Sequence, residues 1–406
     1  MTFFNRIVKA TVLASSMFHT SYGFTAGNLQ KNQFHVSTKL NNLSSTGDIE
    51  STALPISAIE KTSTITLLEH VNLNVPNHDY ILEFYIDILG FGLDPRRAQN
   101  VNNGKGTVWV NCGASQFHLP FGEEAQVIPG NIGLFYDDLE PLKQRLNAYN
   151  GKEEKPFMEY EIINGERDTV RIVDMYGNVF FCRKGADPID IEYEMDIDGK
   201  TETKIMNEFM HVAKQPFLTN SETDLQEFDG TAEKYGISSE ATECKGISYV
   251  EFYIPPNKAE KVAEFYECVF DAPTTVIQDP STDQNVVIVG IGSIDEETGR
   301  CSQNLLFRES EMAAADIPYD GHHIALYIGH DKNDFEQAFK NVVEAQVLWV
   351  NPRFSDKVTN LNTAKKWRQF RFKNVTDLKI GKTIFELEHE CRSIEHDSWP
   401  GKNIDM

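Results

Sequence analysis

The sequence predicts an α+β chain in which one module, a strand followed by a helix and three further strands, occurs four times. Three observations predict this fold class. The chain has 406 residues, enough for two or three domains. Hydrophobic residues make up 40% of it and aromatic residues 11%, a composition typical of folded proteins. Two segments, residues 67–91 and 247–270, repeat the same order of apolar and turn residues, which indicates an internal duplication.

The first 62 residues are expected to lie outside the fold. Arg6 and Lys9 precede a short apolar stretch, residues 11–18, and small residues follow it, as in a cleavable signal sequence. Residues 24–47 contain no acidic side chain and many Ser, Thr and Asn, which is typical of a transit peptide. Together these features resemble the two-part presequence of algae with secondary plastids. We therefore predict a plastid protein, with secretion as the alternative.

The two repeated segments predict the first half of a module. Each begins with alternating apolar residues, the pattern of a strand with one buried face. A proline ends the strand, and Asn77 or Asn257 follows at the position of a helix N-cap. An apolar stripe then marks each helix, and Gly90 is expected just after the first one. The stripes consist of Ile81, Phe84, Tyr85 and Ile88 in the first helix and Val262, Phe265, Tyr266 and Val269 in the second.

Two further segments, residues 131–149 and 323–343, follow the same order of strand and helix. Strand-like runs come after each of the four units. The modules therefore fall into two pairs along the chain, which we predict as two domains at residues 63–186 and 244–393.

An acidic segment, residues 187–243, separates the two pairs. It holds 15 acidic and 4 basic side chains, almost half of the net charge of the chain. Apolar and acidic residues alternate over 189–198, which predicts one strand with an acidic solvent-facing side. The rest is expected to be a linker and a candidate docking segment for a protein partner. Residues 394–406 are expected to form a C-terminal tail.

Composition excludes several classes of function. A net charge of −23 opposes binding to nucleic-acid phosphates. No run of 18 apolar residues occurs, so no membrane-spanning helix is expected. Six cysteines without a CxxC pair indicate free thiols in a reducing compartment. Nucleotide-binding glycine loops, a nucleophile elbow and an HExxH zinc motif are absent.

The motifs EHVNLNVPN…FYIDILGF and DMYGNVFF, set in these modules, resemble the vicinal oxygen chelate superfamily. This superfamily includes glyoxalase I, extradiol dioxygenases and bleomycin-resistance proteins. The resemblance covers both module pairs and implies two glyoxalase/dioxygenase-like barrel domains. It also implies that paired modules form a cup, with metal ligands on their first and last strands. One scaffold hosts many reactions in this superfamily, so the resemblance does not select one.

Carried over residue by residue, the resemblance implies metal ligands only in the first and last modules. His70 and His118 lie at the two ligand positions of module one. His323 and Glu386 lie at those of module four, where Glu388, on the same strand face, remains an alternative to Glu386. Modules two and three have Asn131, Phe181, Tyr249 and Leu305 at these positions.

Which modules pair decides whether there is a metal site. If modules pair in sequence order, each cup holds half a site. If module one pairs with four, then His70, His118, His323 and Glu386 meet in one cup, and this donor set suits Zn, Ni or Fe(II).

The resemblance then implies a glyoxalase-like lyase or isomerase that acts on a small substrate with two neighbouring oxygens, with Glu386 as general base. One alternative is a metal-free ligand-binding or assembly protein of the same fold. A second is an Fe(II) extradiol-type dioxygenase with a facial triad of two histidines and one carboxylate. A fourth ligand at His118 argues against the dioxygenase, because it occupies a position that oxygen or substrate needs.

Overall fold

The computed structural model describes residues 63–399 apart from 95, 114, 151–157, 164–167, 185–241, 280–281, 295–300 and 312–318. The predicted presequence, the strand at 189–198, almost all of the acidic segment and the last seven residues of the tail lie outside the described residues. No helix in the described part of the chain is long and apolar enough to cross a membrane.

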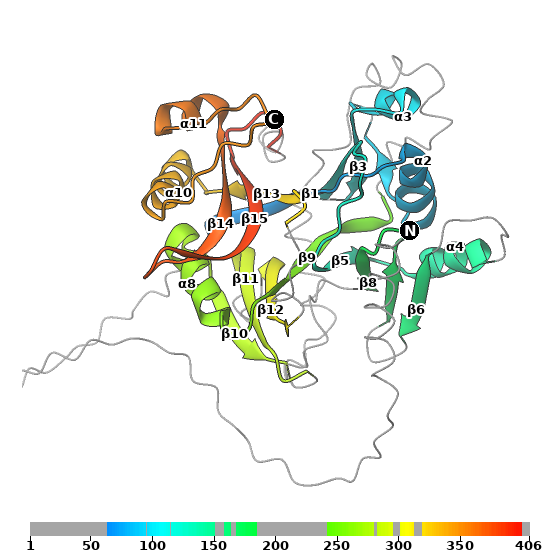
Figure 1. Cartoon of the computed structure of the whole chain (residues 1–406). Coiled ribbons are helices and arrows are strands. Elements are labelled where there is room, and N and C mark those ends of the chain that lie inside the picture. Colours follow the sequence, from blue (N-terminus) through cyan, green and yellow to red (C-terminus); the bar gives the residue numbers. More distant parts are fainter. Residues whose placement is uncertain are drawn as a thin grey trace, which may run out of the picture. The chain divides into compact units, whose positions relative to one another are not determined.

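The strands form two mixed sheets (Figure 1). The seven-stranded first sheet has the order β14-β15-β13-β1-β4-β3-β2. Its strands are β1 (Ile65–Asn72), β2 (Gly92–Leu93), β3 (Thr107–Cys112), β4 (Ser115–Pro120), β13 (His323–Ile328), β14 (Gln369–Asp377) and β15 (Lys382–Ser393). The eight-stranded second sheet has the order β10-β11-β12-β9-β5-β8-β7-β6. Its strands are β5 (Gly130–Tyr136), β6 (Glu159–Ile163), β7 (Thr169–Val173), β8 (Val179–Lys184), β9 (Cys244–Ile254), β10 (Thr274–Gln278), β11 (Asn285–Ile294) and β12 (Cys301–Glu309).

The central strands of each sheet come from modules that are far apart in the chain. β1 pairs antiparallel with β13, and β5 pairs antiparallel with β9. Modules one (β1–β4) and four (β13–β15) therefore build the first sheet, while modules two (β5–β8) and three (β9–β12) build the second. Of the two pairings that the sequence left open, the structure has the one that joins module one to module four. Each predicted domain thus contributes one module to each sheet.

The predicted barrels are open sheets instead. In the described residues, each edge strand pairs with a single neighbour, so neither sheet closes on itself. Strand β2 is only two residues long and cannot continue the ladder. The fold class is α+β, as predicted, but the cups are the curved faces of open sheets.

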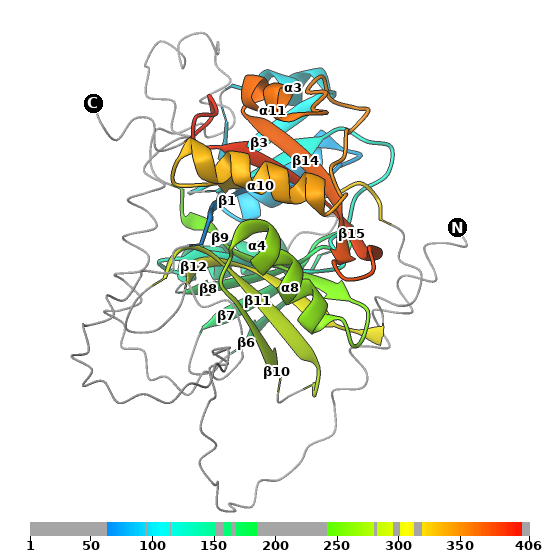
Figure 2. The ribbon, with the colours of Figure 1, turned by 90° about the vertical axis from the view of Figure 1, so that its left-hand side faces the viewer.

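Helices cover the sheets where the apolar stripes predicted them. They are α2 (His78–Tyr80), η1 (Ile81–Ile88), α3 (Gln99–Asn103), α4 (Glu140–Asn150), α8 (Ala259–Phe270), α10 (Lys332–Glu344) and α11 (Leu361–Trp367). α8 packs on β11, and α10 packs against β13 and β15 (Figure 2). The Asn77 side chain caps α2 as predicted, accepting from the Asp79 N–H at 2.8 Å. η1 is a π-helix that continues α2, and Gly90 follows it with φ 71°.

The predicted cap of α8 is wrong. Asn257 lies one residue before the N-cap, with φ 60°, and Lys258 occupies the cap position without a side-chain bond. Glu309 on β12 replaces the missing cap, because its Oε1 accepts from the backbone N–H groups of Lys258 and Ala259 at 2.7 Å each. A partner about fifty residues away is invisible to a local sequence pattern.

One continuous apolar core fills the space between helices and sheets, and aromatic rings make up much of its fully buried part. A separate small cluster lies on the second sheet. It consists of Tyr249, Val286, Ile288 and Leu306, with Ile277 packed against them.

Candidate metal centre

Strands β1 and β13 bring two of the predicted histidines together. His70 pairs with Ala325 across the two strands, and Asn72 pairs with His323. His70 and His323 are therefore diagonal neighbours on one face of the first sheet, a relation that keeps side chains within contact distance. Their ring centroids are 5.8 Å apart, and both residues are at most 1% exposed. We call this face of modules one and four the first cup.

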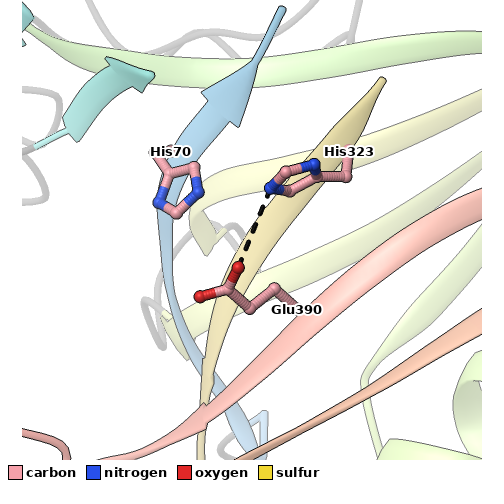
Figure 3. Close-up of side chains that lie close together, drawn as sticks. All are labelled: His70, His323 and Glu390. Atoms are coloured by element: carbon pink, nitrogen blue, oxygen red, sulfur yellow. Dashed lines mark ion pairs between the residues drawn. The ribbon is translucent and has the colours of Figure 1, made fainter. Parts of the chain in front are cut away.

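Strand β15 adds a carboxylate to the two histidines. Its parallel register on β13 places Glu390 opposite Ala325, beside both rings. Ligand atoms of His70, His323 and Glu390 all lie within 4.8 Å of one another (Figure 3). Among the described residues, this is the only such group of histidine, cysteine or acidic side chains. A metal bound at about 2.1 Å needs ligand atoms at most about 4.2 Å apart, so small side-chain movements would close the group around an ion.

Each histidine of this group has a buried nitrogen without a hydrogen-bond partner. These atoms are Nε2 of His70 and Nδ1 of His323. Buried polar atoms are rarely left unbonded, and one without a partner calls for a ligand, ion or water. Nδ1 of His323 lies 4.0 Å from Oε2 of Glu388, whereas Nε2 of His323 lies 3.7 Å from Oε2 of Glu390. Nε2 of His70, Nε2 of His323 and Glu390 are therefore the side-chain atoms that fit a bound cation.

His118 reaches the first cup as predicted, but it does not join the group of three. Its ring stacks on His70 at 3.7 Å between centroids, and Trp109 stacks on its other face at 4.5 Å. Nε2 of His118 lies 3.1 Å from Oε1 of Gln116. Burial, and then the nearby His70 and Arg392, lower the pKa of His118 well below its usual range.

The structure places Glu386 outside the centre, which corrects the predicted carboxylate ligand and base. Its side chain is 40% exposed, and Oε1 pairs with Nζ of Lys373 at 2.6 Å. Glu388 and Glu390 share one strand face because side chains alternate along a strand. The sequence pattern could not choose among the three glutamates, because the β14–β15 pairing contains two register shifts, one of them between Glu386 and His389. Only the pairing with β13 selects Glu390.

Glu388, the alternative considered from the sequence, lies beside the centre. Its Oε2 is 4.0 Å from Nδ1 of His323. Both carboxylate oxygens accept from Nδ2 of Asn351 at 3.0 Å, and Oε1 also accepts from Nη1 of Arg371 at 2.8 Å. These hydrogen bonds hold the carboxylate of Glu388 against Asn351 and Arg371.

Comparing equivalent positions in modules one and four identifies Glu390, which the spacing of residues along β15 did not. In module one, His118 on the last strand stands opposite Asn72, two residues after His70. In module four, Glu390 stands opposite Ala325, two residues after His323. Glu390 therefore holds the position in module four that His118 holds in module one.

A buried network of charges surrounds Glu390. Nε of Arg392 donates to its Oε1 at 2.6 Å, and Nη2 of Arg371 donates to its Oε2 at 2.5 Å. Nε of Arg371 also donates to Asp356 at 3.0 Å, and Arg392 pairs with Glu69. The network has four buried carboxylates and two buried guanidinium groups; its members are Glu69, Asp356, Glu388, Glu390, Arg371 and Arg392. The half-exposed Arg353 approaches Glu388 at 3.8 Å.

Burial and the two arginines set the charge states of the group. Burial lowers the pKa of His323 well below its usual range, and Arg371 adds to this effect, so the ring is neutral. Burial alone would raise the pKa of Glu390, but Arg371 and Arg392 outweigh it and hold that pKa well below its usual range. A neutral imidazole and an ionised carboxylate are the forms that bind metals.

The equivalent face of modules two and three, which we call the second cup, carries no comparable group in its described residues. Asn131 and Tyr249 lie on its first strands, as predicted. The parallel register Glu251↔Leu306 shows that Leu306 holds the last-strand position predicted for Leu305. Leu306 and Tyr249 pack with two further apolar side chains, so the second cup is filled.

Comparisons with known proteins find distant likenesses to solved structures. No protein-family model matches the sequence. No curated protein matches it either. Glyoxalase I from Zea mays is similar at 11% identity and a TM-score of 0.46, covering 80% of this chain and 92% of its own. A lactoylglutathione lyase from Agrobacterium tumefaciens is similar at 20% identity and a TM-score of 0.22, covering 29% and 93%. The bleomycin resistance determinant of transposon Tn5 also has 20% identity and a TM-score of 0.22, covering 29% and 98%.

Proposed function

We propose that this chain is a metal-dependent enzyme of the vicinal oxygen chelate type, with one divalent ion held by His70, His323 and Glu390. The observation that carries the proposal is the buried, unbonded Nε2 of His70, in a group whose ligand atoms lie within 4.8 Å of one another and in which Nε2 of His323 is 3.7 Å from the ionised carboxylate of Glu390. Two imidazoles and one carboxylate suit Zn, Ni or Fe(II).

The charge of the surrounding network supports a cation in this place. Its four carboxylates face two buried arginines and the half-exposed Arg353, so an excess of negative charge remains, which is costly in a buried site. A cation would offset it. His323 would bind without first losing a proton, because its ring is already neutral.

The site favours a metal that serves as a Lewis acid for a substrate with two neighbouring oxygens. Such an ion, when bound, polarises these oxygens and leaves positions open for substrate. His70 and His323 would hold it from modules one and four. Glu390 would be a ligand and not a base, because Arg371 and Arg392 hold its pKa well below its usual range, while each of its oxygens keeps a further lone pair for the ion.

These contacts favour the dioxygenase alternative over the isomerase. A lyase or isomerase of the glyoxalase type needs a free base, and the predicted base, Glu386, lies outside the centre in an ion pair with Lys373. Two histidines and one carboxylate are the ligand set typical of Fe(II) oxygenases. His118 no longer opposes this reading, because its ring covers His70 and its nitrogen faces Gln116.

The isomerase remains the second candidate, supported by one observation. His118 lies against His70, at the position that Glu390 holds in module four. A rotation of this ring would supply a fourth ligand.

Metal analysis of the full chain tests the proposal. We expect about one equivalent of divalent metal after loading with Fe(II), Zn or Ni, measured by elemental analysis after gel filtration. The double variant His70→Ala, His323→Ala should lose it. The control His330→Ala alters an exposed histidine outside the cup and should keep it. Thermal unfolding of all three proteins verifies that they are folded. A wild-type chain without metal would contradict the proposal and favour the metal-free binding protein.

Activity assays separate the two reactions. The Fe(II)-loaded chain should consume oxygen with catechols and yield ring-opened products. Isomerisation of 2-oxoaldehyde–thiol adducts by the Zn- or Ni-loaded chain, without oxygen uptake, would instead establish the second candidate.

A further inference from the structure

Glu69 and His70 are consecutive residues, yet their side chains are in contact in the same cluster. Neighbouring side chains of a regular strand point to opposite faces of a sheet. The pairing of β1 with β13 passes from Leu68↔Leu326 directly to His70↔Ala325, so Glu69 is an extra residue in a β-bulge. This bulge turns Glu69 towards the first cup.

The bulge is held from the second sheet. Oε1 of Gln303 accepts from the backbone N–H of Leu68 at 2.9 Å, and Nε2 of Gln303 donates to the Leu68 carbonyl at 3.1 Å. Gln303 is buried. The backbone just before Glu69 therefore has its hydrogen bonds satisfied by a side chain from another module.

Glu69 orients the ring of His70. Nδ1 of His70 lies 3.1 Å from Oε2 of Glu69, and the hydroxyl of Tyr327 donates to Oε1 at 3.3 Å. A carboxylate at Nδ1 keeps the proton there and leaves Nε2 as a lone-pair donor. Nε2 of His70 is the buried atom without a partner.

Arg392 joins this pair to the ligand of the other module. It forms an ion pair with Glu69 and donates from Nε to Oε1 of Glu390 at 2.6 Å. A single buried chain of contacts therefore runs from His70 through Glu69 and Arg392 to Glu390. It couples a ligand of module one to a ligand of module four.

The second cup contains the same β-bulge as the first, but different side chains at it. The pairing of β5 with β9 passes from Tyr249 to Ile247, so Ser248 is an extra residue at the equivalent place. Ser248 and Tyr249 hold the positions of Glu69 and His70. The bulge is thus common to both cups, whereas the carboxylate and the imidazole occur together in the first cup alone.

We propose that Glu69 and Arg392 are positioning residues of the metal centre: Glu69 sets the tautomer of His70, and Arg392 locks Glu69 to Glu390. This inference rests on the proposed function, because it assumes that a metal binds at His70, His323 and Glu390.

Cobalt(II) binding to the full chain tests the inference, with affinity and the visible absorption spectrum as readouts. Loss of an outer-shell partner typically weakens metal binding about 10- to 100-fold. We expect Glu69→Gln to show this loss and shifted absorption bands. Arg392→Lys keeps the charge but loses the planar two-point contact, and we expect a smaller loss with a similar shift. If Glu69→Gln does not fold, Arg392→Lys decides alone.

Glu251→Gln is the matched control. Glu251 is also buried and ion-paired, with Arg308 at 3.1 Å, but lies in the second cup. It should lower the melting temperature by an amount similar to that of Glu69→Gln without changing cobalt affinity or spectrum. Wild-type affinity and spectrum in both Glu69→Gln and Arg392→Lys would overturn the inference. A wild-type chain that binds no cobalt would instead overturn the proposed function, and the positioning role with it.

Discussion

The first and second cups have the same strand order and the same bulge, but different side chains at the positions where metal ligands are expected. At four equivalent positions the first cup has His70, His118, His323 and Glu390, where the second has Tyr249, Leu306, Asn131 and Phe181. Both cups contain buried ion pairs, but the first has histidines beside them, whereas Tyr249 and Leu306 of the second pack in an apolar cluster. The comparison teaches that the same module accepts either histidines and a carboxylate or mainly apolar side chains at these positions, so the fold does not determine the chemistry.

The largest effect is expected when the first cup receives an apolar residue, as in the second. Glu390→Leu places an apolar side chain where the second cup has the apolar Phe181, and leaves Arg371 and Arg392 buried without their shared carboxylate. Removing one partner of a buried ion pair costs about 3–5 kcal/mol of unfolding free energy. Urea unfolding at pH 7 measures this. Glu386→Leu, in an ion pair that is 40% exposed, should cost less than about 1 kcal/mol. Equal losses in the two variants would show that the network around Glu390 is not essential for stability.

A smaller loss is expected when the second cup is emptied. Leu306→Ala leaves a cavity beside Tyr249, Val286 and Ile288. Such truncations cost about 2–4 kcal/mol, because the surrounding side chains collapse only in part. The same urea unfolding measures it, and metal analysis of the variant tests whether the cups are independent. Metal binding should be unchanged; its loss would mean that the second cup supports the first.

The smallest effect concerns pH and the turn after β15, which packs on a strand of the first cup. The ring of Trp399 lies 4.6 Å from that of Tyr327 on β13, and His396 lies in the same turn. Burial, and then Arg392, lower the pKa of His396 to about 4 from 6.5. Between these values the unfolded chain binds a proton on His396 that the folded chain does not, so this residue makes stability fall as the pH drops through that window.

His396→Asn should remove this contribution while keeping an acceptor for the Ser398 N–H. We expect the wild type to lose about 1–2 kcal/mol more than the variant between pH 7 and pH 4, less than the full shift implies because the ring keeps some contact with water. Urea unfolding at both pH values measures the difference. Equal losses would mean that the pKa of His396 is the same in the folded and the unfolded chain.

Local patterns predicted most of the secondary structure correctly. The apolar stripes became η1 and α8, and Asn77 and Gly90 bound the first helix as expected. The cap of α8 was missed because Glu309 supplies it from a distant strand. For the site, the repeat pointed to the two histidines that meet, His70 and His323, since each begins a strand at the same place in its module.

The sequence by itself determined the four modules, their strands and helices, and the fact that only the first and last modules carry histidines at ligand positions. Only the tertiary structure decided the pairing of module one with module four, the choice of Glu390 over Glu386 and Glu388, and the turn of Glu69 into the cup. The physical reason is the same for all three. A two-residue period makes alternate residues of a strand equivalent, and a bulge shifts that period by one. Both are resolved only by hydrogen bonds to a distant strand, which no local pattern contains: β1 pairs with β13 about 250 residues away, and β15 pairs with β13 about 65 residues away.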